Sequence, residues 1–500
     1  MNARRPALLC FAVLLMLGVT DSAMAQSLKS VGVSRPPPPP SPPPRGSAGG
    51  GGGYHGGRGG FGGWGGVVGG IITAIPQMAP PDGRFVDDGT VVDDDGPSPG
   101  RRPPQRAARR ASHAPPAGER RLVPDEVVIE LRNSATPQQI DALQRRFRLT
   151  RIAQTPIGLT GTTFFRWHIP DRRSVAAVVR QLESDRLVAS AQPNYQFTLQ
   201  QAPAENSEGD AAQYELAKLH LPQAHALARG GHVRVAVIDS AIDAGHPDLG
   251  GAIAESFNAT GTPLEPHPHG TAIAALIAAH GKLVGAAPDA SILAVRAFDP
   301  KGGNAQGTTF AILKGLDWAV AQHARIINMS FAGPADPAMQ RALLAAHKKG
   351  IVLIAAAGNA GPKSPPLFPA ADPEVIAVTA TDAQDGLLAV ANRGRHIAVA
   401  APGADLLVAI PNGGYEVSSG TSYSAAEVSG IAALLIERDG DLKPDRVREI
   451  LMGSAKDLGR RGRDPEFGAG LVDAYKAVMA ETAPVAAASR PVERVSTGRR

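Results

Sequence analysis

Residues 233–240 read Val-Arg-Val-Ala-Val-Ile-Asp-Ser, a short apolar run that ends in a carboxylate and a hydroxyl. Similar apolar runs recur along the chain, with helical runs such as 309–323 and 337–349 between them. Short apolar strands that alternate with helices are typical of a parallel sheet covered on both faces. We therefore predict an α/β domain with a mostly parallel sheet, whose chemistry lies at the carboxyl ends of the strands. The predicted strands are 233–238, 292–298, 326–329, 351–356, 375–379 and 397–400.

Three polar residues stand at the ends of these strands or at the starts of helices. Asp239 follows the first strand, His269 precedes an apolar helix, and Ser422 precedes another helix. A serine hydroxyl becomes a nucleophile when a base lies within hydrogen-bond reach and a third group fixes the tautomer of that base. The start of a helix under Ser422 adds N–H donors where an oxyanion would form. Each residue alone is weak evidence, because serines before helices are more often caps.

The order Asp, His, Ser and the motifs around these residues resemble the subtilisin-like serine proteases over residues 212–481. The matching stretches are 235–240 (Val-Ala-Val-Ile-Asp-Ser), 246–249 (His-Pro-Asp-Leu), 269–271 (His-Gly-Thr), 284–288 (Val-Gly-Ala-Ala-Pro), 328–330 (Asn-Met-Ser), 356–359 (Ala-Ala-Gly-Asn), 399–403 (Val-Ala-Ala-Pro-Gly), 420–422 (Gly-Thr-Ser) and 467–474 (Phe-Gly-Ala-Gly-Leu-Val-Asp-Ala).

The resemblance implies a serine endopeptidase in which Ser422 is the nucleophile, His269 the general base and then acid, and Asp239 the orienting carboxylate. It makes Asn359 the oxyanion-hole donor, the alternative being a turn residue. His246 and His267 are interpreted as structural or loop residues. The residues that the resemblance assigns to substrate binding, in part by pairing with the substrate as an added strand, are Ser330, Phe331, Ala332, Gly333, Ala357 and Gly358.

Some positions depart from the family pattern without removing a catalytic atom. Ala241, Ala272, Tyr423 and Ala426 replace the usual Gly, His, Met and Pro, which changes the packing around the triad. Residues 279–282 (Ala-His-Gly-Lys) replace a loop that binds calcium in many relatives, and they offer no carboxylate or amide ligand. We therefore expect this calcium site to be absent and no cofactor to be required for the chemistry, while structural calcium elsewhere stays open.

A small α+β domain is predicted at 122–199, ahead of the peptidase domain at 212–481. Its strands are expected at 127–129, 162–169 and 187–191, and its second helix at 175–182. Thr136 is expected to cap the first helix, with Pro137 as its first residue and Gln139 closing a capping box. The pattern resembles the family's ferredoxin-like inhibitory propeptides, which implies an intramolecular inhibitor cut off between Tyr195 and Gln213. A retained accessory domain is the alternative.

The ends of the chain are predicted to be unstructured or removed. Residues 1–25 have the charged start, apolar run and small-residue end of a secretory signal, the alternative being an uncleaved anchor. Residues 26–121 are rich in Pro and Gly and are interpreted as a disordered linker, although a glycine tract is also compatible with RNA binding. Aspartates at 87–95 fit a solvated charge run better than a calcium loop. A disordered tail is expected at 482–500.

Composition limits the remaining function classes. The one cysteine, Cys10, lies within the predicted signal, which excludes disulfides, cysteine nucleophiles and thiolate metal sites from the mature chain. Although the net charge is +5, residues 212–481 hold 23 Lys and Arg against 27 Asp and Glu. We therefore expect no nucleic-acid partner. The expected protein is exported, secreted or periplasmic, without a membrane span, and acts on polypeptides as a monomer. The alternatives are a catalytically silent peptide-binding relative and a surface scaffold on a Pro/Gly stalk.

Overall fold

The computed structural model describes residues 112–202, 213–301 and 304–481. All of them belong to one compact unit of the chain, Arg102–Arg500. The predicted signal peptide, residues 26–111 of the predicted linker and the predicted tail lie outside the described residues. No helix in the described part of the chain is long and apolar enough to cross a membrane.

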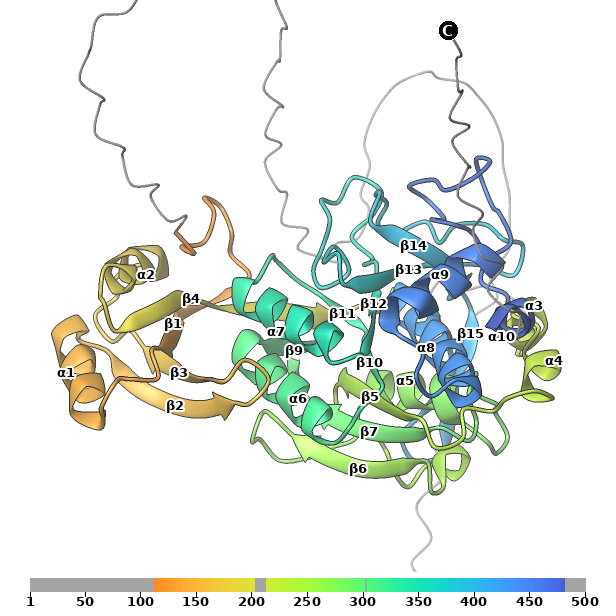
Figure 1. The fold of residues 1–500 in the computed structure, drawn as a ribbon, viewed down its shortest axis with the longest axis horizontal. Helices are drawn as coiled ribbons and strands as arrows, with labels where there is room; N and C mark the ends of the chain where they lie inside the picture. Colours follow the sequence, from red (N-terminus) through yellow and green to blue (C-terminus); the bar gives the residue numbers. More distant parts are fainter. Residues whose placement is uncertain (1–111, 203–212, 302–303, 482–500) are drawn as a thin grey trace, which may run out of the picture. The chain divides into compact units, whose positions relative to one another are not determined.

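The small domain, β1 to β4, is an antiparallel sheet with two helices packed against it (Figure 1). Its strands lie in the order β2-β3-β1-β4, which is the predicted ferredoxin-like arrangement. Side chains of β1, β3 and α2 form a core around the fully buried Trp167. The elements are β1 (Leu122–Leu131), α1 (Pro137–Phe147), β2 (Thr150–Ile157), β3 (Thr162–His168), α2 (Val175–Glu183) and β4 (Val188–Leu199).

Local sequence signals place α1 but not β2. α1 begins as predicted, since Gln139 N donates to Thr136 Oγ1 (3.3 Å) and Thr136 N donates to Gln139 Oε1 (2.9 Å). β2 has no counterpart among the predicted strands, because it is an edge strand with mostly exposed residues and little apolar alternation. β4 runs on to Leu199, well beyond the predicted end at 191, through polar residues that are nevertheless buried.

The small domain also makes contacts ahead of Leu122. His113 N donates to Glu183 Oε1 (2.6 Å), and Arg121 O accepts from Gln196 N (2.9 Å). Residues 112–121, assigned to the linker from their composition, therefore lie against α2 and β4. The proline and arginine content of these residues does not predict such contacts, because each contact is made by a single backbone group.

The large domain, α3 to α10, contains the predicted parallel sheet. Its strand order is β14-β13-β12-β10-β5-β7-β6, and every neighbouring pair is parallel. The strands are β5 (Arg234–Asp239), β6 (Ile253–Asn258), β7 (Ser291–Arg296), β10 (Ile326–Met329), β12 (Val352–Ala356), β13 (Val375–Thr381) and β14 (Ile397–Pro402).

Helices cover both faces of this sheet, as the apolar strands predict (Figure 1). In β5, Val235 and Val237 face a core shared with α5 (Pro268–Ala278) and α8 (Thr421–Arg438). Ala236 and Ile238 face the opposite core, which includes α6 (Thr309–Ala321) and α7 (Pro337–Lys348). Alternate side chains of one strand thus hold two helical layers in place.

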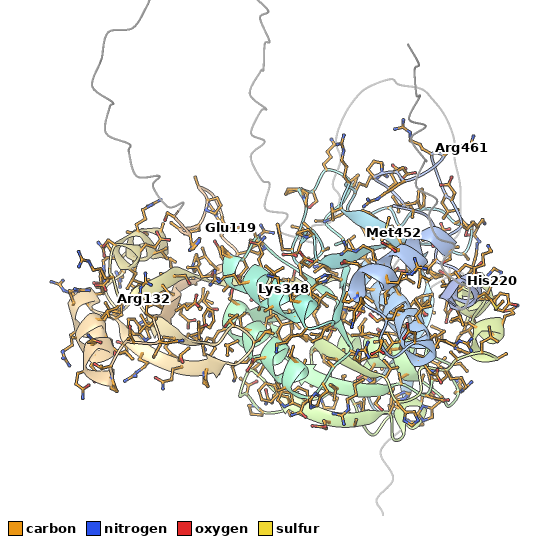
Figure 2. The ribbon with its side chains drawn as sticks, viewed as in Figure 1. Glu119, Arg132, His220, Lys348, Met452 and Arg461 are labelled. Carbon is orange, nitrogen blue, oxygen red and sulfur yellow. The ribbon has the colours of Figure 1, made fainter. Side chains whose placement is uncertain are left out.

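The remaining helices and strands lie outside the parallel sheet and the helices described so far. Met452, labelled in Figure 2, is on α9 and packs against the core that contains α8. β15 and β16 form a hairpin, and β8, β9 and β11 lie in the sheet that contains β4. Their bounds are α3 (Tyr214–Lys218), α4 (Leu221–His225), η1 (Pro247–Leu249), β8 (Phe298–Lys301), β9 (Asn304–Thr308), β11 (Phe331–Ala332), β15 (Leu406–Ile410), β16 (Gly414–Ser418), α9 (Pro444–Ser454) and α10 (Ala474–Glu481).

Candidate active site

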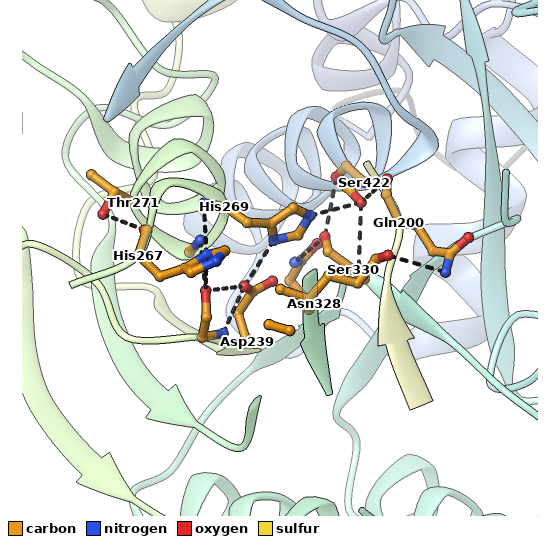
Figure 3. A network of polar contacts seen from close by, with 12 residues as sticks. Gln200, Asp239, His267, His269, Thr271, Asn328, Ser330 and Ser422 are labelled. Atoms are coloured by element: carbon orange, nitrogen blue, oxygen red, sulfur yellow. Dashed lines mark hydrogen bonds and ion pairs between the residues drawn. The ribbon is translucent and has the colours of Figure 1, made fainter. Parts of the chain in front are cut away.

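The three polar residues singled out in the sequence meet at the carboxyl end of the parallel sheet (Figure 3). His269 Nδ1 lies 2.8 Å from Asp239 Oδ1, and His269 Nε2 lies 3.0 Å from Ser422 Oγ. All three side chains are buried. This is the hydrogen-bond arrangement of a serine nucleophile, its base and the carboxylate that orients the base.

Secondary structure holds each member of this group. Asp239 is the last residue of β5, and His269 and Ser422 are the second residues of α5 and α8 rather than residues ahead of them. Asn359 Oδ1 accepts from Thr421 N (3.2 Å) and Thr421 Oγ1 (2.9 Å) at the start of α8. The first turns of two helices and one strand end therefore fix the geometry.

Asp239 is held by a neighbour that the sequence analysis does not single out. Its Oδ1 accepts from Ser240 N (2.7 Å) and from Ser240 Oγ (3.0 Å) as well as from His269. Its Oδ2 has no hydrogen-bond partner among the described residues. Only the adjacency of an aspartate and a serine in the chain hinted at this contact, and adjacency is a common local pattern.

The end of β4 enters this site as an added strand. Thr198 and Leu199 pair with β11, opposite Ala332 and Phe331, and β9 pairs with β4 on the other side. Gln200 N donates to Ser330 O (3.1 Å), and Ala202 N donates to Ser419 O (2.8 Å). Backbone hydrogen bonds therefore hold the chain on both sides of the Gln200–Gln201 bond.

The carbonyl of Gln200 lies against the nucleophile. Gln200 O accepts from Asn359 Nδ2 (2.8 Å), and Ser422 Oγ lies within hydrogen-bond distance of the same oxygen. Gly420 makes this approach feasible, because a Cβ at that position would lie 2.6 Å from Gln200 O. The side chain of Gln200 is held as well, since its Oε1 accepts from Asn359 N (2.8 Å) and its Nε2 donates to Thr198 O (3.0 Å). No sequence signal marks Gln200, because strand addition is made through the backbone.

The residues assigned to substrate binding fall into two groups. Ser330, Phe331 and Ala332 bond the backbone of residues 198–200, and a Cβ on Gly333 would lie 2.2 Å from the ring of Phe197. Ala357 and Gly358 make their backbone hydrogen bonds elsewhere, to Val378 O (2.9 Å) and Thr421 Oγ1 (3.2 Å) respectively. They are the two residues that precede Asn359 in the chain.

Phe197 occupies an apolar recess. It is fully buried, and its ring lies edge-on to Phe331 at a centroid distance of 5.9 Å. Phe331 in turn packs against Phe298 of β8 at 5.0 Å. Relative to the Gln200–Gln201 bond, the recess takes the fourth residue on the amino-terminal side.

Side chains of β4 also accept hydrogen bonds from backbone N–H groups at the starts of two helices. Asn194 Oδ1 accepts from Phe310 N of α6 (3.3 Å), and Gln192 Oε1 accepts from Ala338 N of α7 (3.0 Å). Gln192 Nε2 donates to the fully buried Asp336 (2.7 Å), whose pKa is raised by burial. The small domain therefore contacts the large one through polar groups at the starts of two of its helices.

The short loop at 279–283 surrounds a carboxylate with donors. Asp248 accepts from Lys282 N (2.6 Å), Leu283 N (3.2 Å) and Tyr415 OH (2.9 Å). N–H and O–H groups do not coordinate cations through their protons, so these residues do not fit a calcium ion. In the described part of the chain, no three His, Cys, Asp or Glu side chains gather as a metal cluster would require. The expected absence of the loop calcium stays a prediction.

One buried carboxyl is on the helix of Ser422, and a second lies close enough to it to affect its pKa. Glu427 is on α8, and Glu215 is on α3, where it accepts from Gln213 Nε2 (3.0 Å). Oε2 of each has no hydrogen-bond partner among the described residues. Burial raises the pKa of Glu215 to about 7, and burial together with the charge of Glu215 raises the pKa of Glu427 well above 4.5.

Comparisons with known proteins agree with this geometry. The chain is 34% identical over 275 residues to thermitase of Thermoactinomyces vulgaris, which covers 53% of this chain and 96% of thermitase. The model of the subtilase family matches residues 230–470. The chain belongs to the subtilase family. Subtilases are serine endopeptidases, and the fervidolysin N-terminal prodomain matches residues 108–194, which include most of the small domain of this subtilase.

Two further relatives are longer than the matched region. The minor extracellular protease Epr of Bacillus subtilis is 32% identical over 331 residues, covering 63% of this chain and half of Epr. The solved structure of fervidolysin from Fervidobacterium pennivorans, described as a keratinolytic enzyme related to subtilisin, has a TM-score of 0.62 at 23% identity. It covers 72% of this chain and 61% of the fervidolysin chain, and shows the shared fold.

Proposed function

We propose that this subtilase is an exported serine endopeptidase, made as a zymogen, that hydrolyses peptide bonds through an acyl-enzyme. The observation that carries the proposal is the carbonyl of Gln200, which accepts from Asn359 Nδ2 while Ser422 Oγ reaches the same group. A peptide bond in this position is next to a nucleophile, a base and an oxyanion donor at once.

The steps follow from these contacts. Ser422 Oγ attacks the carbonyl carbon and gives its proton to His269 Nε2, while Asp239 holds Nδ1–H in place. Asn359 Nδ2 and the backbone N–H of Ser422 stabilise the oxyanion. His269 then protonates the leaving nitrogen, the C–N bond breaks, and an ester remains on Ser422. Water, deprotonated by His269, attacks the ester; His269 then returns this proton to Ser422 Oγ as the C–O bond breaks and the second product leaves.

We place the self-processing bond between Gln200 and Gln201. Hydrogen bonds from Gln200 N to Ser330 O and from Ala202 N to Ser419 O hold the residues on either side of this bond. After cleavage the small domain keeps its contacts through Gln192 and Asn194 to the helices of the large domain. The cut strand would therefore remain in the groove as an inhibitor until it is removed.

Reaction with a fluorophosphonate probe separates the enzyme from a silent peptide-binding relative. We expect the probe to label the processed wild-type protein and to leave Ser422→Ala unlabelled. Ser424→Ala is the matched control, because Ser424 is on the same helix but its Oγ bonds Ala401 O (3.0 Å) and Pro402 O (2.9 Å). Labelling of Ser422→Ala equal to that of wild type would contradict the assignment of the nucleophile.

The remaining features of the proposal concern setting and partners. Polypeptides are the substrates, the small domain is the intramolecular inhibitor, and no nucleic acid takes part. The name of Epr describes an extracellular protease, which supports export of this chain to the medium or a periplasm. The proposed enzyme works as a monomer without a catalytic metal and without calcium at 279–282. The alternative for the small domain, a retained accessory domain, predicts an active enzyme that still contains 122–199 covalently.

A further inference from the structure

A second histidine lies within hydrogen-bond distance of the catalytic group (Figure 3). His267 is the N-cap of α5, and its Nδ1 accepts from His269 N (3.3 Å). The same Nδ1 lies 3.2 Å from Ser240 Oγ, which bonds Asp239 Oδ1 (3.0 Å). Ser240 has one hydroxyl proton, so His267 Nδ1 and Asp239 Oδ1 are alternative acceptors for it. The ring of His267 therefore lies against the group that orients His269.

His267 is fixed by its backbone as well as by its ring. His267 N donates to Ala241 O (2.9 Å), and His267 O accepts from Thr271 Oγ1 (3.0 Å). The side chain is half-buried, so its orientation is set by the protein while solvent protons can still reach it. An N-cap side chain normally accepts through oxygen, which does not titrate near neutral pH. An imidazole in this position accepts only when Nδ1 carries no proton.

Protonation of His267 would have two local effects. First, the new Nδ1–H would face the N–H of His269, so the first turn of α5 would lose its cap. Second, a positive charge would stand beside the ring of His269, which must itself become positive when it takes the proton of Ser422. Both effects change the position or the basicity of His269. Neither requires His267 to contact the substrate.

Burial, more than the charges around it, keeps the ring of His267 neutral. Burial lowers the pKa of His267, Asp239 at the end of β5 raises it, and His269 on α5 lowers it. The net direction is downward, so a neutral His267 is the form present at neutral pH. Below its pKa the ring is charged and the cap on His269 is lost.

We propose that His267 is a positioning residue whose neutral ring holds His269 in place. Acid would then inactivate the enzyme through two protonations, one of His269 and one of His267. This inference rests on the proposed peptidase function. The acid limb of log(kcat/KM) against pH would then steepen from a slope of about one to about two as His267 takes up its proton.

The test uses His267→Asn and His267→Ala in the full chain after processing. Asparagine keeps a cap acceptor that does not titrate, so the limiting acid slope should fall to about one. Alanine removes the cap, and kcat/KM should fall by about fivefold at neutral pH, where the wild-type ring is neutral and still caps α5. Activity is measured on the p-nitroanilide of Phe-Thr-Leu-Gln, the sequence of residues 197–200.

The control is His246→Asn. His246 is also an imidazole N-cap, whose Nδ1 accepts from Asp248 N (3.1 Å), but it caps η1 and has no hydrogen bond to the triad. We expect this variant to keep the slope of about two. A slope that stays at about two in His267→Asn, or drops equally in His246→Asn, would overturn the role of His267.

A readout that needs no activity keeps this inference separate from the peptidase proposal. In Ser422→Ala protein, the ¹⁵N amide signal of His269 should titrate together with the ring of His267. Titration of that ring with no change in the His269 amide would refute the positioning role. Failure of wild-type protein to react with fluorophosphonate would instead refute the peptidase function.

Discussion

Replacing Glu215 with glutamine tests how the buried carboxyls Glu215 and Glu427 respond to pH. Glu215 is fully buried, and burial raises its pKa from 4.5 to about 7. A carboxyl with a raised folded-state pKa costs nothing below its unfolded pKa, where both states are protonated. The free-energy cost grows as pH rises above 4.5 and reaches its full value once pH passes about 7.

The size of this cost follows from the shift in pKa. At about 1.4 kcal/mol for each pH unit, the raised pKa of Glu215 corresponds to about 3 kcal/mol of unfolding free energy at alkaline pH. Glu215→Gln removes the charge, and its amide oxygen can still accept from Gln213 Nε2. We therefore expect the variant to be about 3 kcal/mol more stable than its parent at pH 9 and equal to it at pH 4.

The assay is urea unfolding followed by circular dichroism in the Ser422→Ala background, which prevents self-digestion. Glu449→Gln is the control, because Glu449 is 66% exposed and paired only with Arg446. It should change stability by less than about 0.5 kcal/mol at either pH. A Glu215→Gln effect that is the same at pH 4 and pH 9 would refute the reasoning about buried charge.

Three further predictions concern the groove and the short loop. Asn359→Ala removes the side-chain donor to Gln200 O, so kcat should fall about 10²–10³-fold with little change in KM, measured on a chromogenic peptide; an unchanged kcat would contradict the role. Gly333→Ala places a methyl group in the space of the Phe197 ring. Cleavage of peptides with Phe as the fourth residue before the cleaved bond should therefore fall more than cleavage of peptides with Ala there. Equal losses for both peptides would argue against the recess. Asp248→Asn should lower the thermal midpoint equally with and without calcium, because Asp248 accepts hydrogen bonds there; a calcium-dependent loss would indicate an ion.

Periodicity and short motifs predict the large domain well. β10 begins and ends where the apolar run predicts, and β5, β12 and β14 differ from the predicted strands by a few residues at most. These strands are buried on both faces, so each residue contributes to the signal. The meeting of Asp239, His269 and Ser422 follows once the sheet is known to be parallel, because their strand ends and helix starts then share one edge.

Other features carry no signal in the sequence. The edge strand β2 and the last residues of β4 gain their structure from hydrogen-bond partners far along the chain. Gln200 is placed by the backbone contacts of an added strand and by the bond from Asn359 N to its Oε1, and His267 gains its importance only from where its Nδ1 lies. The structure or role of each of these features depends on tertiary contacts of single polar groups, which cannot be predicted from residue type alone.

The most direct test of the account is the mass and amino-terminal sequence of the chain after refolding in vitro. Wild-type protein should yield a new amino terminus at Gln201 and a fragment that ends at Gln200, while Ser422→Ala should remain intact. Cleavage of wild type at another bond, or equal cleavage of Ser422→Ala at the same bond, would contradict the claim that Ser422 acts on the carbonyl of Gln200.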